Sequence, residues 1–137
     1  MKRISLILLW GFCSMALSNV SFHGYLVQPP NCTISNAQTI EITFQDVLID
    51  DINGSNYEQT VPYSITCDTA VRDPLMEMTL SWSGTQSDFD DAAVSSNITG
   101  LGIQLKQAGQ SFTINTPLVV NETDLPVLTA VPVKKSG

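Results

Sequence analysis

The sequence predicts an all-β protein built as an antiparallel β-sandwich. Apolar and polar residues alternate along most of the chain, as in strands with one buried face, and helical periodicity is nearly absent. The alternating segments are short and are separated by turn residues, and two cysteines follow an export signal. Short strands stapled by one disulfide are typical of a secreted sandwich domain.

The first 18 residues have the pattern of a signal peptide. Lys2 and Arg3 precede an apolar run that reaches about Met15, and the small residues Ala16 and Ser18 predict cleavage just after them. This run is too short to span a bilayer comfortably, and no second apolar segment of ~20 residues follows. We therefore expect an exported chain that is not membrane-embedded.

The charge of the exported chain argues against nucleic-acid binding. Cleavage removes Lys2 and Arg3 from a sequence with a net charge of −7, which leaves about −9 on the remaining 119 of 137 residues. No basic patch is left to replace phosphate counterions. The length fits one small domain.

Cys32 and Cys67 are the cysteines of the exported chain, and an oxidising compartment favours a disulfide between them. The alternative is a metal site. With His23 as the single histidine and no CxxC motif, the ligands for zinc are missing. We expect neither a metal nor another cofactor.

Residues 19–28 alternate like a strand that has nothing ahead of it to pair with. Val20, Phe22 and Leu26 fall on one face, with Gly24 between them. Two prolines at 29 and 30 then separate the segment from the rest of the chain. It is either the first strand of its own sheet or a strand that pairs with a neighbouring molecule.

Two strands are predicted in the first half of the body. Residues 39–49 place Ile40, Ile42 and Phe44 on one face, and the phase shifts near Asp46, where a bulge or bend fits. A turn at Asn53 and Gly54 leads into a strand over residues 57–67. Pro62 removes one ladder donor from that strand, so it should lie where the bond is not needed.

The second half predicts a half-buried strand over residues 75–84, a hairpin over 97–115 and a last strand within 125–137. Ala108 and Gly109 occupy the hairpin turn. One face of the last strand is expected to carry Val127, Thr129, Val131 and Val133. Between the first two elements lies an acidic loop, which lacks the regular ligand spacing of an EF-hand and is expected to be solvated.

No constellation of residues supports catalysis. Nucleophilic chemistry would have to use His23, in the isolated N-terminal segment, where no orienting acid is predictable. Paired carboxylates occur only in loops and turns. We expect that the chain is not an enzyme.

Five segments resemble the chaperone-usher fimbrial subunits of Gram-negative bacteria, in particular the minor pilins of type 1 and P-like pili. They are "VSFHGYL" after the signal, "PPNCTI", "VPYSITC", "GLGIQL" and "LTAVPVKK". Their order and spacing carry the resemblance, which covers essentially the whole exported chain.

The resemblance implies an incomplete immunoglobulin-like β-sandwich, the pilin fold, which is completed by a donated strand. A periplasmic chaperone first fills the open groove, and the N-terminal extension of the next subunit replaces it at the outer-membrane usher, in donor-strand exchange. Residues 19–30 would be this extension and residues 31–137 the pilin domain.

Four residues of the extension take roles by this resemblance. Val20, Phe22 and Leu26 would enter pockets of the neighbour, and Gly24 would lie where the neighbour's core comes closest to the donor backbone. Family members continue past "VPVKKSG" into a further alternating strand, so we expect a C-terminally incomplete domain, from either a fragment or a truncated gene product.

The resemblance favours a structural subunit of an adhesive fimbria, exported through the periplasm to the cell surface and supporting cell adhesion. Its partners would be neighbouring subunits, the chaperone and the usher, and no nucleic acid. The alternative is a secreted immunoglobulin-like binding module or adhesin that recognises a ligand directly. Tip adhesins of this family usually carry an extra lectin domain, for which 119 residues leave no room.

Overall fold

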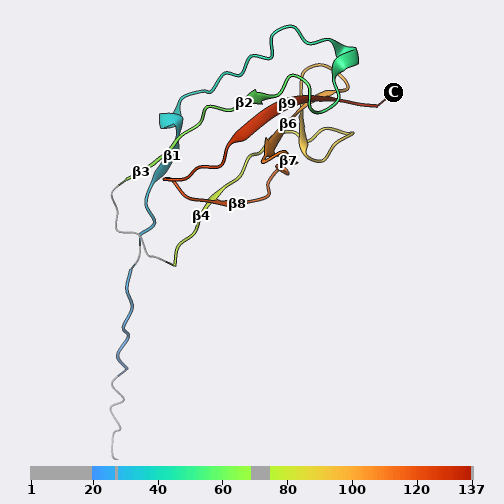
Figure 1. The fold of residues 1–137 in the computed structure, drawn as a ribbon. Helices are drawn as coiled ribbons and strands as arrows, with labels where there is room; N and C mark the ends of the chain where they lie inside the picture. The colour runs from blue at the N-terminus through green and yellow to red at the C-terminus, as the bar shows by residue number, and fades with distance from the viewer. Residues whose placement is uncertain (1–19, 27, 69–74, 137) are drawn as a thin grey trace, which may run out of the picture.

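The computed structural model describes residues 20–26, 28–68 and 75–136 (Figure 1). The expected signal peptide, residues 1–18, lies outside the described residues. The described part contains two single-turn 3-10 helices, η1 (Ser35–Ala37) and η2 (Ile49–Asp51), and short strands. The strands are β1 (Cys32–Ile34), β2 (Gln59–Thr60), β3 (Ile65–Cys67), β4 (Met78–Leu80), β5 (Ala93–Ser95), β6 (Leu101–Gln107), β7 (Gln110–Ser111), β8 (Leu118–Val120) and β9 (Leu128–Lys134). The all-β prediction is confirmed.

The central sheet has the strand order β2-β9-β6-β5, with β7 paired to β6. All its pairs are antiparallel, and the longest runs from Leu101 opposite Lys134 to Gln107 opposite Leu128. Strands β6 and β7 form the predicted hairpin, in which Ala108 and Gly109 have φ values of +50° and +76°. Positive φ at both central residues matches the twist of the flanking strands.

A second layer faces this sheet across the core. Strand β4 pairs with β8, and Leu80 and Val120 from these strands pack against Leu128 of β9 and Phe112. The indole N–H of Trp82 donates a hydrogen bond of 2.6 Å to the carbonyl oxygen of Phe112. This bond ties the β4–β8 layer to the hairpin of the central sheet. These two layers make up the sandwich.

The predicted strand over residues 57–67 is interrupted at Pro62. Its first part, β2, pairs with β9, and its second part, β3, pairs with β1. The Tyr63 hydroxyl donates a 2.6 Å hydrogen bond to the carbonyl oxygen of Pro126. Because proline lacks an N–H, the chain changes partners at the position where a ladder bond is unavailable.

Strand β9 is buried on both faces, which differs from the one-sided strand expected from the sequence. Val131 has no exposed surface and Val133 is buried, but Ala130 and Leu128 of the opposite face are buried as well. Val127 lies outside the strand and is exposed. The core cluster covers the face of Leu128, and loops hydrogen-bonded to Gln104 of β6 and Lys134 of β9 lie against the sheet.

The acidic loop is one of these covering loops, so it is more than a solvated loop. Gln104, opposite Val131 in the sheet, is buried and donates a 3.0 Å hydrogen bond to the Asp90 carboxylate. The same carboxylate accepts a 2.9 Å bond from the backbone N–H of Ala92. These bonds hold the loop over the sheet.

The loop around η2 covers β9 near its C-terminal end. Lys134 Nζ donates a 2.7 Å hydrogen bond to the carbonyl oxygen of Ile49, and Lys106 Nζ donates one to that of Gly54. The Asn53 side chain accepts bonds from the two N–H groups of Ser55 and Asn56, at 2.9 and 2.8 Å. With Gly54 at φ +78°, the predicted turn is confirmed.

Candidate functional site: an exposed strand-like segment and an open groove

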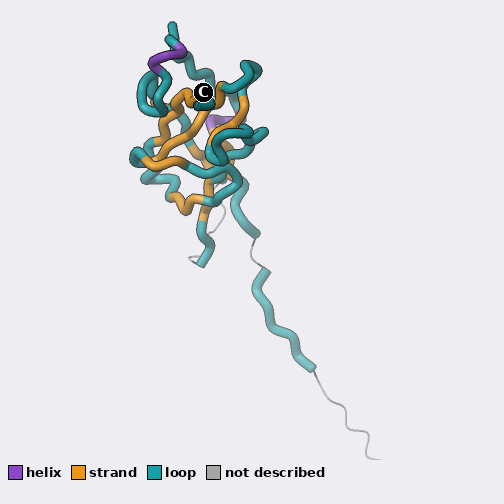
Figure 2. The backbone as a smooth tube through the Cα atoms, turned by 90° about the vertical axis from the view of Figure 1, so that its right-hand side faces the viewer, coloured by secondary structure: helices purple, strands orange, loops and turns teal. Residues whose placement is uncertain are grey.

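The N-terminal segment, residues 20–26, leads away from the body of the domain (Figures 1 and 2). The apolar side chains of its predicted face stand in solvent, with exposed fractions of 69% for Val20, 92% for Phe22 and 100% for Leu26. A Cβ added to Gly24 would meet no atom within 4 Å. The folded body therefore makes no use of this apolar face.

Leaving three large side chains exposed forgoes considerable stabilisation. Full burial of one such side chain is worth about 1.5–3 kcal/mol. On the opposite face, the only hydrogen bond of His23 that the structure describes is a 2.8 Å contact between Nε2 and Ser21 Oγ. The segment thus offers an apolar row and a free backbone for pairing rather than a chemically reactive group.

A second strand-like segment, residues 39–44, lies on the body without a sheet partner among the described residues (Figure 1). Ile40, Ile42 and Phe44 are half-buried and alternate with exposed neighbours. The alternation expected from the sequence is present, but the predicted strand over residues 39–49 is not formed. We call residues 39–44 the open segment.

Backbone geometry on both sides explains why the open segment is unpaired. In η1, the residues Ser35, Asn36 and Ala37 have φ values of +46°, +53° and +59°, which turn the chain away from the β1–β3 ladder. At the other end Gln45 has φ +57°, at the bend predicted near Asp46. An extended stretch between two such turns presents its N–H and C=O groups as an edge that another strand can use.

A small hollow of about 150 Å³ opens beside the open segment. Ile40 lines it from one side and Leu80 and Trp82 from the β4 layer, and the core residues Phe112 and Leu128 also contribute. The two layers of the sandwich are therefore not closed over their shared core at this edge. An apolar side chain from an added strand has a place to enter here.

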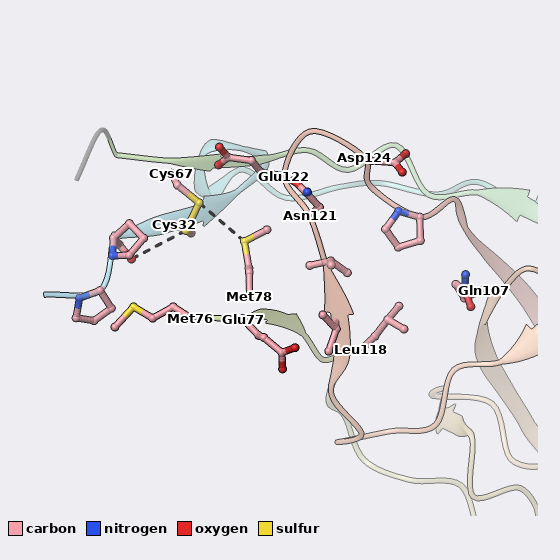
Figure 3. Close-up of a pocket in the computed structure, with 15 residues that line it drawn as sticks. Cys32, Cys67, Met76, Glu77, Met78, Gln107, Leu118, Asn121, Glu122 and Asp124 are labelled. Carbon is pink, nitrogen blue, oxygen red and sulfur yellow. Dashed lines mark hydrogen bonds between the residues drawn. A yellow bond between two sulfur atoms is a disulfide. The ribbon is translucent and has the colours of Figure 1, made fainter. Parts of the chain in front are cut away.

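A larger hollow of about 970 Å³ lies where the N-terminal segment joins the body (Figure 3). Cys32 and Cys67 are directly opposite each other on β1 and β3 and form the expected disulfide. Met78 Sδ lies 3.9 Å from the sulfur of Cys67. The remaining walls come from the prolines at 29 and 30, Met76 and Glu77 before β4, and β8 with the acidic residues Glu122 and Asp124.

Strand β8 supplies Leu118, Val119 and Val120 to this hollow and was not predicted from the sequence. The run is three apolar residues without alternation, which is too short to distinguish a strand from a loop by period. The flanking residues Pro117 and Asn121 could have indicated a strand here, because proline and asparagine often mark the ends of strands.

Across residues 20–26, 28–68 and 75–136 there is no group of three or more His, Cys, Asp or Glu side chains that could hold a metal ion. Within the same residues, no helix has the length and apolar character needed to cross a membrane.

Burial raises the pKa of Tyr63, and the hydrogen bond from Lys135 lowers the pKa of Asp88, both at structural contacts.

The chain is similar to known fimbrial proteins. The family model described as "Fimbrial protein" matches residues 20–134. The uncharacterized fimbrial-like protein YfcQ of Escherichia coli is 51% identical over 121 residues, which cover 86% of this chain and 75% of the relative. The uncharacterized fimbrial-like protein YfcR of the same organism is 32% identical over 116 residues, which cover 80% of this chain and 64% of the relative. No solved structure matches the chain.

Proposed function

Because the chain belongs to the fimbrial protein family, we propose that it is a structural subunit of an adhesive fimbria that joins its neighbours by donor-strand exchange. The all-β fold fits that family, whose members are structural proteins, so the chain is not an enzyme. Other fimbrial subunits are its partners.

The observation that carries the proposal is the exposed N-terminal segment. Val20, Phe22 and Leu26 form an apolar row that the body leaves in solvent, and Gly24 has open space around it. Such a row is favourable only when another molecule buries it. A strand donated to a neighbour gains main-chain hydrogen bonds and side-chain pockets together.

The open segment supports the receiving half of the same joint. Its six residues span about 20 Å at the usual rise of a strand, close to the length of the seven-residue N-terminal segment. The hollow between Ile40 and Trp82 gives an incoming apolar side chain access to the core. In this proposal one chain carries both halves of a donor-strand joint.

The same features argue for the periplasmic chaperone and the outer-membrane usher as partners. An unpaired strand edge beside an apolar hollow invites aggregation, so the chain needs a partner that covers this edge before assembly. In this proposal the chaperone covers it in the periplasm, the usher exchanges the chaperone for a neighbour's extension, and the fimbria at the cell surface supports adhesion.

A peptide with the sequence of residues 19–28 tests the proposal. Added to the exported protein at about 100 times its dissociation constant, it should stabilise the fold by about 2.7 kcal/mol, seen as a rise in the thermal midpoint. A peptide with Phe22→Asp should have no effect, because its carboxylate cannot enter an apolar pocket. The matched control, Tyr25→Ser on the opposite face, should still stabilise. If the unchanged peptide produces no shift, the proposal is wrong.

A further inference from the structure

We propose that Asn53 is a site of spontaneous deamidation, at which the backbone nitrogen of Gly54 attacks the side-chain amide and converts residue 53 to aspartate or isoaspartate. These two residues form the turn that closes the loop around η2, and this loop lies against the central sheet. The inference does not depend on the proposed function.

The reaction needs no enzyme and consumes one water molecule. The Gly54 nitrogen forms a bond with Cγ of Asn53, the bond from Cγ to Nδ2 breaks, and ammonia leaves with the proton of the Gly54 N–H. Water then opens the cyclic imide that remains. Opening at Cγ gives aspartate, whereas opening at the backbone carbonyl carbon of residue 53 gives isoaspartate, whose main chain is one methylene longer.

Gly54 supplies an accessible nucleophile. Its N–H donates no hydrogen bond to any of the described residues, so no such bond has to break before the attack. Because glycine has no side chain, nothing on Gly54 shields its nitrogen from Cγ of Asn53. Its φ of +78° is costly for other residues, so the turn favours the residue type that hinders this reaction least.

The Asn53 side chain is held in place and polarised for attack. Its Oδ1 accepts hydrogen bonds from the N–H of Ser55 at 2.9 Å and from that of Asn56 at 2.8 Å. These bonds fold the side chain back over the main chain that runs through Gly54. Attack at Cγ moves negative charge onto Oδ1, and the two N–H groups already directed at this oxygen stabilise that charge.

The surroundings of the turn also favour the reaction. Asn53 is exposed, so water reaches the imide for hydrolysis. Lys106 Nζ donates a hydrogen bond to the carbonyl oxygen of Gly54. This places a positive charge close to the nitrogen that must lose its proton, and such a charge favours the deprotonated form.

Isoaspartate is the product that changes the structure. Its extra methylene lies in the main chain just before Gly54, so the carbonyl oxygen of Gly54 can no longer keep its place at Lys106. The loop carries the buried Ile52 and a second contact, from Lys134 to the carbonyl oxygen of Ile49. Aspartate keeps a side-chain acceptor at the same place, so it can still close the turn.

Peptide mapping by mass spectrometry, with isoaspartyl methyltransferase labelling, tests the inference on the exported protein incubated in neutral buffer. The same chain unfolded in urea gives the intrinsic rate of the Asn53–Gly54 pair. Native protein should convert at no less than about a tenth of that rate, which allows about 1.4 kcal/mol of extra barrier. A slower native rate would mean that the fold protects Asn53, and the proposal would be wrong.

Asn121 is the internal control in the same samples. Its Oδ1 likewise accepts hydrogen bonds from the N–H and the hydroxyl of Thr123, at 3.1 and 2.9 Å. The next residue, however, is Glu122, which has a side chain beside the attacking nitrogen. Asn121 should therefore convert at least about tenfold more slowly than Asn53 in the native protein. Equal rates would overturn the assignment to the turn at Gly54.

Thermal unfolding tests the structural consequence. Protein in which residue 53 has become isoaspartate should unfold at least about 4 °C below fresh protein, because the Lys106 contact is lost. Asn53→Ser is the control variant, since its hydroxyl can close the turn but carries no amide from which an imide could form. After the same incubation its midpoint should be unchanged. Isoaspartate-containing protein that unfolds like fresh protein would refute the loosening of the loop.

Discussion

Removal of the Cys32–Cys67 disulfide should destabilise the domain by about 4 kcal/mol. The two cysteines are 35 residues apart, and in the chain-entropy model a closed loop of this size restricts the unfolded chain by roughly that amount at 25 °C. Domains of this size have total stabilities of only about 5–15 kcal/mol. The disulfide therefore supplies a large share of what keeps this domain folded.

The loss should be large here because little else fixes the end of the domain near the disulfide. Strands β1 and β3 pair over only three residues each, and Cys32 is opposite Cys67 at the end of that ladder. All three β1 residues are exposed, so burial contributes little to holding the strand in place. Without the covalent link, β1 and the N-terminal segment should detach first.

Thermal unfolding followed by circular dichroism measures the effect on the Cys32→Ser, Cys67→Ser double variant. At about 4–8 °C per kcal/mol for a small domain, the midpoint should fall by roughly 16–32 °C. A reducing agent should lower the midpoint of the unchanged protein by a similar amount and leave the double variant unaffected. A decrease that corresponds to less than about 1 kcal/mol would refute the chain-entropy argument for this loop.

Three further predictions concern single positions. Gly24→Leu should change the unfolding free energy of the monomer by less than about 0.5 kcal/mol, because a Cβ added at this position meets no atom within 4 Å. A 19–28 peptide with the same change should nevertheless no longer raise the thermal midpoint. Phe112→Ala should cost about 3–5 kcal/mol in urea unfolding, since Phe112 is buried in the core, whereas the exposed control Val127→Ala should cost under about 0.5 kcal/mol. The hydrogen bond and charge of Lys135 lower the pKa of Asp88, so the pair stabilises the fold above the unfolded pKa of that carboxyl and loses this effect as the pH falls through the lower folded pKa. Lys135→Met should therefore raise the pKa of Asp88 in an NMR titration. An unchanged pKa would contradict the assignment.

The local features of this protein are determined by the sequence itself. Residues 108 and 109 specify a tight hairpin between two alternating runs, and Asn53 with Gly54 specifies a turn closed by its own side chain. The exposed apolar row of residues 20–26 follows from period-two alternation ahead of two prolines. These features were predictable because the interactions that make them lie within a few residues along the chain.

The tertiary structure decided which segments find partners. Residues 39–44 alternate as clearly as β6 does, yet they form no ladder with the described residues, because η1 and the bend at Gln45 turn the chain away from its nearest strand. Strand β9 is buried on both faces because Gln104 and Asp90 hold a distant loop over it. The larger hollow beside the disulfide likewise depends on β4 and β8, which are about 40 residues apart and meet only in the folded chain. Strand pairing and burial join residues far apart in sequence, so local periodicity identifies a strand but cannot say whether another strand will cover it.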